Sequence, residues 1–254
     1  MGALHEGHGR LIGEARRDTE CVVVSIFVNP IQFNQPEDYA LYPRTLETDA
    51  AFCDARGVDL IFAPSAEEMY PWAQTTFVDV TLLTDGLCGK YRPGHFRGVA
   101  TVVLKLLNIV QPHRAYFGEK DAQQLAVIRR MVQDLMLPVS IVAIPTVREP
   151  DGLAMSSRNA RLNAEERRSA AVLYAALRHV EDRVRGGATG AAGLRREALD
   201  IFAREPGVRL EYFEIVDPGE LQPVQQISGP VLAATAAWVG GTRLIDNITC
   251  LPAA

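Results

Sequence analysis

The sequence predicts an α/β fold with a parallel sheet, followed by a smaller α+β domain. Residues 21–28 are nearly all apolar and rich in valine, which is typical of a strand buried on both faces. Such strands alternate with helical patterns up to residue 147, an order that indicates a parallel sheet. After residue 160, two helices precede three strands. We therefore predict two domains, residues 1–147 and 148–254, with the boundary in the stretch 147–151.

Local signals support each element of the first domain. Helix 9–17 places Leu11, Ile12 and Ala15 on one face. Pro112 ends the apolar helix 98–110, because proline cannot continue a helix. Asp121 is expected to cap a further helix, whose inward residues are Leu125, Ile128, Val132 and Leu135. The other expected elements are helix 46–56 and strands 58–63, 76–81, 115–117 and 139–147.

The second domain begins with a capping-box pattern at residues 163–166. A long helix follows, whose inward positions recur at helical spacing and are Val172, Leu173, Ala176, Leu177, Val180 and Val184. A connection rich in glycine and alanine, residues 186–193, leads to a second helix that ends near Arg204. The three final strands are expected at residues 209–216, 230–239 and 242–249.

The composition excludes several classes of protein. The chain has 254 residues, of which 48% are hydrophobic and 22% charged, as in ordinary globular proteins. Its net charge of −5 argues against a general nucleic-acid binder, which needs a basic surface. No apolar run approaches the roughly 20 residues of a membrane helix, and no leader is recognisable, so we expect a cytoplasmic protein. The four cysteines form no C-x-x-C pair, so we expect reduced, mostly buried thiols.

Two histidines, His5 and His8, lie three residues apart at the expected start of a helix, which puts both rings on one side. Free backbone N–H groups and the positive helix end favour phosphate there. Imidazoles add donors for charge that develops at a phosphorus atom. The spacing does not match the zinc pattern H-E-x-x-H. Taken alone, the segment is better explained by two surface histidines at a frayed terminus.

The segment 118–121, Gly-Glu-Lys-Asp, joins a strand to a helix. Ligands of open parallel sheets bind beyond the carboxyl ends of the strands, where Lys120 can reach a phosphate. Asp121 is a candidate helix cap or a candidate acceptor for a ribose hydroxyl. A cap beside a solvated lysine explains the segment equally well. One of Gln123 and Gln124, in the first turn of the helix, is a candidate to face the ligand.

Two other polar segments are candidate ligand sites. The hydroxyls of Ser156 and Ser157 and the guanidinium of Arg158 can hold β- and γ-phosphates. A solvated linker is the simpler explanation of that segment alone. Asn29 and Gln32 follow a buried strand, and the donors and acceptor of Gln32 suit a hydroxy acid. Turn chemistry around Pro30 explains this pair equally well.

Charged residues supply weaker candidates. Arg92 belongs to the positive cluster 92–97, which would attract anionic substrates or is an ordinary exposed loop. Asp38, Glu47 and Asp49 are candidates to hold Mg²⁺ through water, because Mg²⁺ takes few protein ligands. A solvated helix face explains these carboxylates as well.

Seven segments of the chain form a recognisable series. They are MGALHEGH (1–8), SIFVNP (25–30), YPRT (42–45), RPGHFRGV (92–99), FGEKDAQQ (117–124), DGLAMSSRN (151–159) and RLIDN (243–247). Together they resemble the pantothenate synthetase family, also called pantoate–β-alanine ligases. They follow the family order over essentially the whole chain, although H-x-G-H also occurs in many nucleotidylyltransferases.

The resemblance implies a Rossmann-like first domain of the H-x-G-H nucleotidyltransferase type and a C-terminal domain that closes over the site. It implies a cytoplasmic homodimer that uses ATP and Mg²⁺. Pantoate would attack the α-phosphorus of ATP to give pantoyl adenylate and pyrophosphate. The amine of β-alanine would then give pantothenate and AMP. The bound intermediate must be kept from water.

The resemblance also assigns roles to individual residues. The catalytic candidates are His8, as proton donor, together with His5, Lys120, Ser156 and Arg158. Pantoate contacts are expected at Gln32 and Gln124. Together with the residues considered above, the full set of substrate candidates is Gln32, Gln124, Asn29, Tyr42 and Arg92, and Asp49 is the candidate metal ligand from the carboxylates alone. The expected ATP-binding residues are Met1, Gly2, Ala3, Leu4, His5, Glu6, Gly7, His8, Gly118, Glu119, Lys120, Asp121, Val147, Met155, Ser156, Ser157 and Arg158.

The family pattern begins before the first residue of this chain. In the family, a strand and a Pro-Thr step precede the first motif, so Met1 takes the place of an internal methionine. We therefore expect a chain that lacks the first strand, whose neighbours lose a partner at about 1–3 kcal/mol per unpaired buried group. Two alternatives remain open, a nucleotidylyltransferase with the same H-x-G-H chemistry and an inactive truncated copy.

Overall fold

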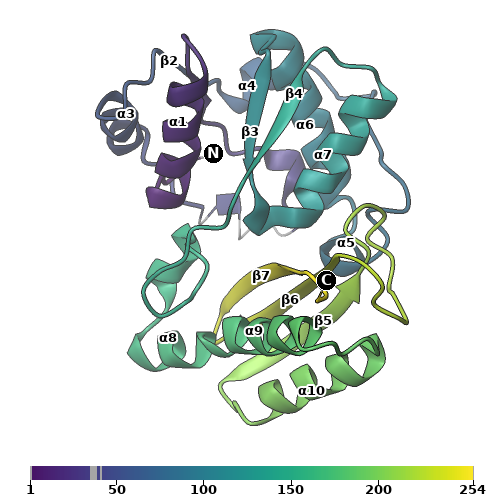
Figure 1. Ribbon diagram of the computed structural model, residues 1–254. Helices are drawn as coiled ribbons and strands as arrows, with labels where there is room; N and C mark the ends of the chain where they lie inside the picture. The colour runs from purple at the N-terminus through teal and green to yellow at the C-terminus, as the bar shows by residue number, and fades with distance from the viewer. Residues whose placement is uncertain (1, 35–38, 41, 254) are drawn as a thin grey trace. The chain divides into compact units, whose positions relative to one another are not determined.

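A computed structural model describes residues 2–34, 39, 40 and 42–253 of the chain (Figure 1). The predicted candidates Met1 and Asp38 lie outside the described residues. The chain divides into two compact units. The first comprises Met1–Thr81, Tyr91–Glu119 and Val127–Pro145, and the second comprises Leu82–Lys90, Lys120–Ala126 and Thr146–Ala254. The domain limits 1–147 and 148–254 remain predictions from the sequence.

The first unit contains two pairs of parallel strands. β1 (Val23–Ser25) pairs with β2 (Leu60–Phe62), and β3 (Arg114–Gly118) pairs with β4 (Ser140–Ile144). Parallel pairing confirms the predicted α/β class. The described strands form two separate pairs instead of one continuous sheet. The other elements of this unit are α1 (Glu6–Asp18), η1 (Pro30–Gln32), α3 (Leu46–Asp54), α4 (Ala66–Met69) and α6 (His95–Val110).

Two local predictions in this part of the chain are wrong. Residues 76–81 form no strand, because the N–H of Val78 donates to Oγ1 of Thr101 (3.0 Å) and not to a neighbouring strand. Leu135 is 48% exposed, because α7 (Ala122–Asp134) ends one residue before it. The buried residues of α7 are Leu125, Val127, Ile128 and Met131, with Gln123 at the start of the helix.

The core beside β1 and β2 comes from helix and strand together. Ile12 and Ala15 of α1 pack with Val22, Val24 and Ile26 along β1, and Cys53 of α3 completes the cluster. This confirms that Ile12 and Ala15 form the inner face of the first helix. Leu11 is only partly buried.

The second unit is built on an antiparallel sheet in the order β5 (Val208–Val216), β6 (Val231–Val239) and β7 (Thr242–Cys250). All three strands confirm the prediction. Figure 1 shows α9 (Val172–Arg185) and α10 (Ala191–Ala203) along one face of this sheet. The unit also contains α5 (Leu87–Tyr91), η2 (Glu119–Asp121) and η3 (Ser157–Arg161), and the bounds of α5 and η2 extend by one residue into the first unit.

The long helix predicted after residue 163 is two helices. Asn163 caps α8 (Ala164–Ala170) with the expected capping box, in which Glu166 bonds back to the N–H of Asn163. Ala171 separates α8 from α9. The inward positions of α9 are confirmed, since Leu173, Ala176, Leu177, Val180 and Val184 are fully buried. Val172 packs only partly against this core.

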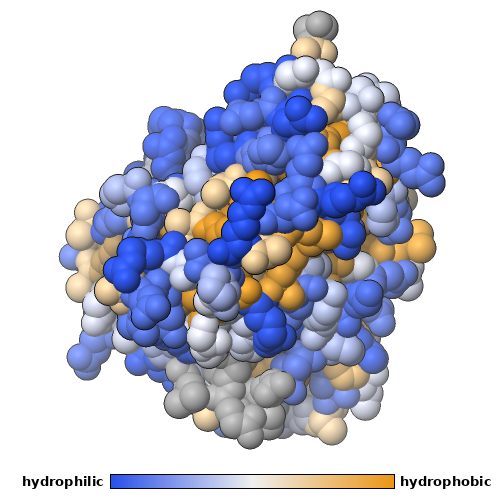
Figure 2. Space-filling model, turned by 90° about the horizontal axis from the view of Figure 1, so that it is seen from below, coloured by the Kyte–Doolittle hydropathy of each residue, from blue (hydrophilic) through white to orange (hydrophobic). Residues whose placement is uncertain are grey.

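The remaining surface and sulfur features agree with the composition. Figure 2 shows one face on which polar residues surround a smaller group of apolar ones, as is common on globular proteins. All four cysteines are free, and Cys53, Cys88 and Cys250 are buried, as predicted. Within the described ranges, no helix is both long enough and apolar enough to span a membrane.

Candidate active site

His5 and His8 form a reciprocal cap at the start of α1. Nδ1 of His5 accepts from the N–H of Gly7 (3.1 Å), and Nδ1 of His8 accepts from the N–H of His5 (3.2 Å). A neutral imidazole whose Nδ1 accepts must carry its proton on Nε2. The ring centroids are 4.1 Å apart, so the two Nε2–H donors belong to one small patch. The rings thus occupy backbone donors that the sequence predicted to be free for phosphate.

The loop before these histidines is held by Asp49. Its carboxylate accepts from the N–H of Ala3 (3.0 Å) and of Leu4 (2.7 Å), and the hydroxyl of Thr45 also donates to it (3.3 Å). Asp49 is only 2% exposed. Ala3 has a positive φ of 50°, a left-handed conformation that costs energy for a non-glycine residue. The carboxylate therefore fixes a strained approach to His5. Its assignment to a metal stays a prediction.

The turn after β1 places Gln32 against α6. The main-chain oxygen of Gln32 lies 2.8 Å from Nδ1 of His95 and 3.3 Å from Nη2 of Arg92. Its side-chain Oε1 lies 3.3 Å from Nδ2 of Asn29, which is 2% exposed. Three of the predicted substrate residues, Asn29, Gln32 and Arg92, are therefore gathered at one place. Tyr42 has its ring 5.6 Å from that of Phe33.

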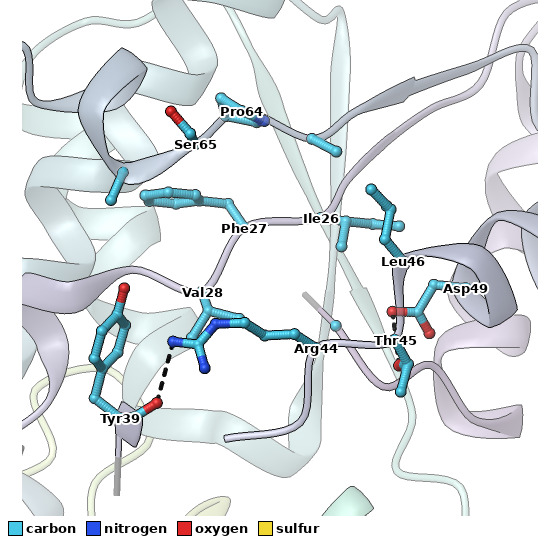
Figure 3. Close-up of a pocket in the computed structure, with 13 residues that line it drawn as sticks. Ile26, Phe27, Val28, Tyr39, Arg44, Thr45, Leu46, Asp49, Pro64 and Ser65 are labelled. Atoms are coloured by element: carbon cyan, nitrogen blue, oxygen red, sulfur yellow. Dashed lines mark hydrogen bonds between the residues drawn. The ribbon is translucent and has the colours of Figure 1, made fainter. Parts of the chain in front are cut away.

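A cavity of about 220 Å³ lies beyond the carboxyl ends of β1 and β2 (Figure 3). Ligands of parallel sheets commonly bind at such ends. Residues 26–28 and 63–66 line the cavity together with Gly2 and Asp49, but His5 and His8 do not. Arg44 and Tyr39 also line the cavity, and Nη2 of Arg44 donates to the carbonyl oxygen of Tyr39 (3.2 Å). A group bound here would lie against Gly2, at the start of the loop that leads to His5.

The predicted lysine turn follows β3. Gly118 ends β3, and Glu119, Lys120 and Asp121 form η2. Nδ2 of Asn247 donates to the carbonyl oxygen of Lys120 (2.8 Å), so β7 fixes the main chain of the lysine. Of the two glutamines, Gln123 is buried and donates to the carbonyls of Leu83 and Gly86. Gln124 is only partly buried and is the better candidate to face a ligand.

The predicted serine–arginine segment is the end of a short hairpin. The N–H of Met155 donates to the carbonyl of Val147 (2.9 Å), which brings two of the predicted nucleotide contacts together. Ser156 caps η3, since its Oγ accepts from the N–H of Arg158 (3.2 Å). Ser157 is partly buried in the first turn of η3. The segment is therefore an ordered turn and not a solvated linker.

An ion pair with a buried carboxylate and a partly buried guanidinium supports this hairpin. Arg148 donates from Nη1 and Nη2 to the two carboxylate oxygens of Asp246 (2.7 and 3.0 Å), and Nη1 also reaches the carbonyl of Gly152. Asp246 is 2% exposed. Burial raises the pKa of Asp246 above its ordinary value, and the guanidinium of Arg148 opposes this shift. β7 thus anchors the hairpin through Asp246 and the lysine turn through Asn247.

The predicted site residues are shared between the units. The first unit carries residues 2–8, 29, 32, 42, 49, 92, 118 and 119, and the second carries residues 120, 121, 124, 147 and 155–158. Their convergence on one triphosphate stays a prediction.

Comparison with known proteins identifies the family. The chain matches the family model described as pantoate-beta-alanine ligase over residues 1–249. The chain belongs to this family.

Individual relatives agree over nearly the whole chain. A pantothenate synthetase of Heliobacterium modesticaldum is 55% identical over 248 residues, which cover 98% of this chain and 88% of that protein. The crystal structure of pantothenate synthetase from Thermus thermophilus matches with a TM-score of 0.94 at 49% identity, covering 98% of this chain and 90% of that one. The ligase of Francisella tularensis, complexed with beta-gamma ATP and beta-alanine, has a TM-score of 0.80 and 37% identity, with 98% and 86% covered.

These matches confirm the predicted family, its α/β fold and its enzyme class, a ligase. They give no support to the nucleotidylyltransferase alternative. Sequence reasoning nevertheless missed residues that hold the site segments, namely Asp246, Asn247 and Tyr70, whose hydroxyl donates to Oδ1 of Asn29 (2.7 Å), as well as the anchoring role of Asp49. One signal was present, because Asp246 and Asn247 lie in the segment RLIDN, to which the sequence assigned no role.

Proposed function

We propose that this chain condenses pantoate with β-alanine through a pantoyl adenylate, consuming ATP and releasing AMP and pyrophosphate. The observation that carries the proposal is the family match over residues 1–249. The Francisella tularensis relative, complexed with beta-gamma ATP and beta-alanine, supports the same pair of substrates here. Pantoate is the acid that the family description requires.

The histidine patch suits the adenylation step. Attack of a carboxylate on the α-phosphorus places growing negative charge on phosphate oxygens and on the departing pyrophosphate. Nε2–H groups on His5 and His8 would donate hydrogen bonds to those oxygens. His8 would be the general acid, as predicted. Preorganised donors act without rearrangement at the moment of reaction. The reciprocal cap and Asp49 would provide this preorganisation.

Residues of the second unit would bind the nucleotide. Lys120, Ser156 and Arg158 would neutralise and hold the triphosphate, and the hydrogen-bonded pair Val147 and Met155 would contact the nucleoside. The remaining predicted ATP contacts, including Gly118, Glu119, Asp121 and Ser157, belong to the same proposal. Gln32 and Gln124 would hold pantoate, with Asn29, Tyr42 and Arg92 around it.

Magnesium enters the proposal through the nucleotide. The oxygens of Asp49 accept main-chain hydrogen bonds, and the described residues contain no group of three or more histidine, cysteine or acidic side chains suited to a metal. Asp49 therefore fits an anchor better than a metal ligand. Mg²⁺ in ATP-dependent enzymes is often held mainly by phosphates and water, and would supply charge neutralisation. We also propose a cytoplasmic homodimer, which the family resemblance implies.

Pyrophosphate exchange into ATP tests the function. Exchange that depends on pantoate, and formation of AMP only when β-alanine is added, are the expected results. Exchange that depends on a phosphate-bearing acceptor in place of pantoate would contradict the ligase and favour the nucleotidylyltransferase.

Single-turnover kinetics test the role of Lys120. Lys120→Ala should slow adenylate formation far more than it lowers the melting temperature, because a lysine near the surface contributes little to stability. An unchanged adenylation rate in Lys120→Ala would remove this lysine from the mechanism.

Gln124→Ala should mainly weaken pantoate binding.

A further inference from the structure

Four groups of the first unit form a chain of hydrogen bonds that ends at Gln32. The hydroxyl of Tyr70 lies 2.7 Å from Oδ1 of Asn29. Nδ2 of Asn29 lies 3.1 Å from the carbonyl oxygen of Gly98 and 3.3 Å from Oε1 of Gln32. We call Tyr70, Asn29, Gly98 and Gln32 the amide relay. Asn29 is nearly fully buried, so each of these contacts matters for its orientation.

The carbonyl of Gly98 sets the direction of every bond in the amide relay. A carbonyl oxygen only accepts, so the amide atom of Asn29 that faces it must be the nitrogen. Oδ1 of Asn29 must then face Tyr70, whose hydroxyl must donate. The same nitrogen faces Gln32, so the atom of Gln32 on that side must be its oxygen. One main-chain group therefore orients two side-chain amides.

The close approach of α6 maintains this arrangement. A Cβ atom at position 98 would lie 2.5 Å from the carbonyl oxygen of Ile31 and 2.9 Å from Cα of Gln32, so only glycine fits. The main-chain oxygen of Gln32 is held by the first residue of α6 and by the turn that precedes this helix. Nδ1 of His95 lies 2.8 Å away and must donate, and Nη2 of Arg92 also donates at 3.3 Å.

Tyr70 is itself held as a donor. Burial raises its pKa to about 12, so it stays protonated near neutral pH. Nζ of Lys105 lies 4.2 Å from the centre of the Tyr70 ring and donates to the carbonyl of Met69 (2.7 Å) and to Oε1 of Gln74 (2.9 Å). A cation over the ring face restrains the ring.

We propose that Tyr70 is a positioning residue for pantoate, because its hydroxyl holds Oδ1 of Asn29 and so keeps Nδ2 of Asn29 bonded to the side-chain oxygen of Gln32. The N–H groups of Gln32 then face the substrate. The inference rests on the proposed function, in which Gln32 contacts pantoate. Gln32 then recognises an acceptor oxygen, such as that of a carboxylate. An isosteric glutamate side chain in place of Gln32 would keep the contact with Asn29 and lose every donor toward the substrate.

The test measures the KM of pantoate, ATP and β-alanine separately in the wild type and in Gln32→Glu, Gln32→Ala and Tyr70→Phe. We expect Gln32→Glu to raise the KM of pantoate at least as much as Gln32→Ala does. Tyr70→Phe should raise the KM of pantoate about fivefold, as expected for one lost hydrogen bond, and leave the KM of ATP unchanged. Tyr116→Phe is the matched control, since the hydroxyl of Tyr116 makes a long, exposed contact with Asp18 (3.5 Å).

The outcomes separate the inference from the proposed function. Wild-type protein without pantoate-dependent turnover would overturn both. Normal wild-type turnover with a pantoate KM in Gln32→Glu equal to that of wild type would overturn only the donor assignment. If wild-type turnover is normal and the KM of pantoate is the same in Tyr70→Phe and Tyr116→Phe, the positioning role of Tyr70 is overturned.

Discussion

The two units hold their predicted ligand-binding segments by different interactions. In the first unit, side chains bond directly to the main chain of the loops, as Asp49 does to residues 3 and 4. In the second unit, Asn247 also bonds to the main chain of Lys120, but charged side chains in addition pair with one another. Arg148 pairs with Asp246, and Arg167 pairs with Glu149 (2.5 Å) and Asp151 (2.7 Å).

This difference predicts different consequences of mutation. A side chain that bonds to a loop's main chain mainly fixes conformation, so its loss should reduce activity more than stability. A buried ion pair holds two charges out of water, so removal of one partner leaves an uncompensated charge. Stability should therefore suffer most in the second unit, and catalysis most in the first.

The largest effect on stability is expected for Asp246→Ala. Its loss leaves the guanidinium of Arg148 without its carboxylate partner, which should cost about 3–5 kcal/mol of unfolding free energy. Urea unfolding followed by Trp238 fluorescence in a Trp72→Phe background reports on the second unit, because the chain has two tryptophans and only Trp238 lies there. Asp200→Ala, an exposed carboxylate on α10, is the control. A loss no greater than that of the control would contradict the comparison.

The next effect is expected for Asp49→Ala in the first unit. Two main-chain N–H groups lose their acceptor, at about 1–3 kcal/mol. The adenylation rate should fall by a larger factor than this loss of stability explains, because the main chain of residues 3 and 4, which leads to His5, is no longer fixed. Titration with Mg²⁺ distinguishes an anchor from a metal ligand. If Asp49 is an anchor, Asp49→Asn should lower the maximal adenylation rate and leave the half-saturating Mg²⁺ concentration unchanged. If Asp49 is a metal ligand, Asp49→Asn should raise the half-saturating Mg²⁺ concentration.

The sequence predicted helices and strands better than the residues that hold the site segments in place. The inner face of α9 was predictable because five buried residues repeat at helical spacing, and β5–β7 because β-branched and apolar residues recur along each strand. The break at Ala171 was not, because alanine is a good helix former and Ala171 itself keeps helical dihedral angles, so no residue type marks the break.

The candidate site followed the same rule. His5, His8, Gln32 and Lys120 were found from short motifs, because each motif is local in the sequence. Their supports are not local. Asp49 lies 45 residues from Leu4, and Asp246 lies 98 residues from Arg148. No pattern within one segment contains such a pair, so only the fold reveals it.

A smaller effect is expected for Asn247→Ala. This substitution removes the bond from Nδ2 to the carbonyl of Lys120, which should cost about 0.5–1.5 kcal/mol. The lysine turn would lose its support from β7, so the KM of ATP should rise while that of β-alanine stays constant. Equal increases in all KM values would instead indicate a general loss of structure.

The smallest effect depends on pH and concerns Arg167→Met. Burial raises the pKa of Glu149, but hydrogen bonds from Arg167 and Asn159 outweigh it and hold the pKa below the ordinary 4.5. The hydrogen bond from Arg167 also lowers the pKa of Asp151 from the ordinary 3.8. A lowered carboxyl pKa stabilises the folded state above the ordinary pKa, and this stability is lost as pH falls through the folded pKa. Wild type should therefore lose unfolding free energy more steeply than Arg167→Met between about pH 5 and about pH 3.

At neutral pH the variant should be less stable by roughly 1 kcal/mol or less, because the pairs are partly exposed and screened by water. Arg168→Met, the exposed neighbouring arginine, should keep the wild-type slope. Trp238 fluorescence again follows the second unit. If the unfolding free energies of Arg167→Met and Arg168→Met fall equally steeply as the pH is lowered, the ion pairs of Arg167 contribute nothing measurable. The contrast between the two units then rests on the pair of Arg148 and Asp246 alone.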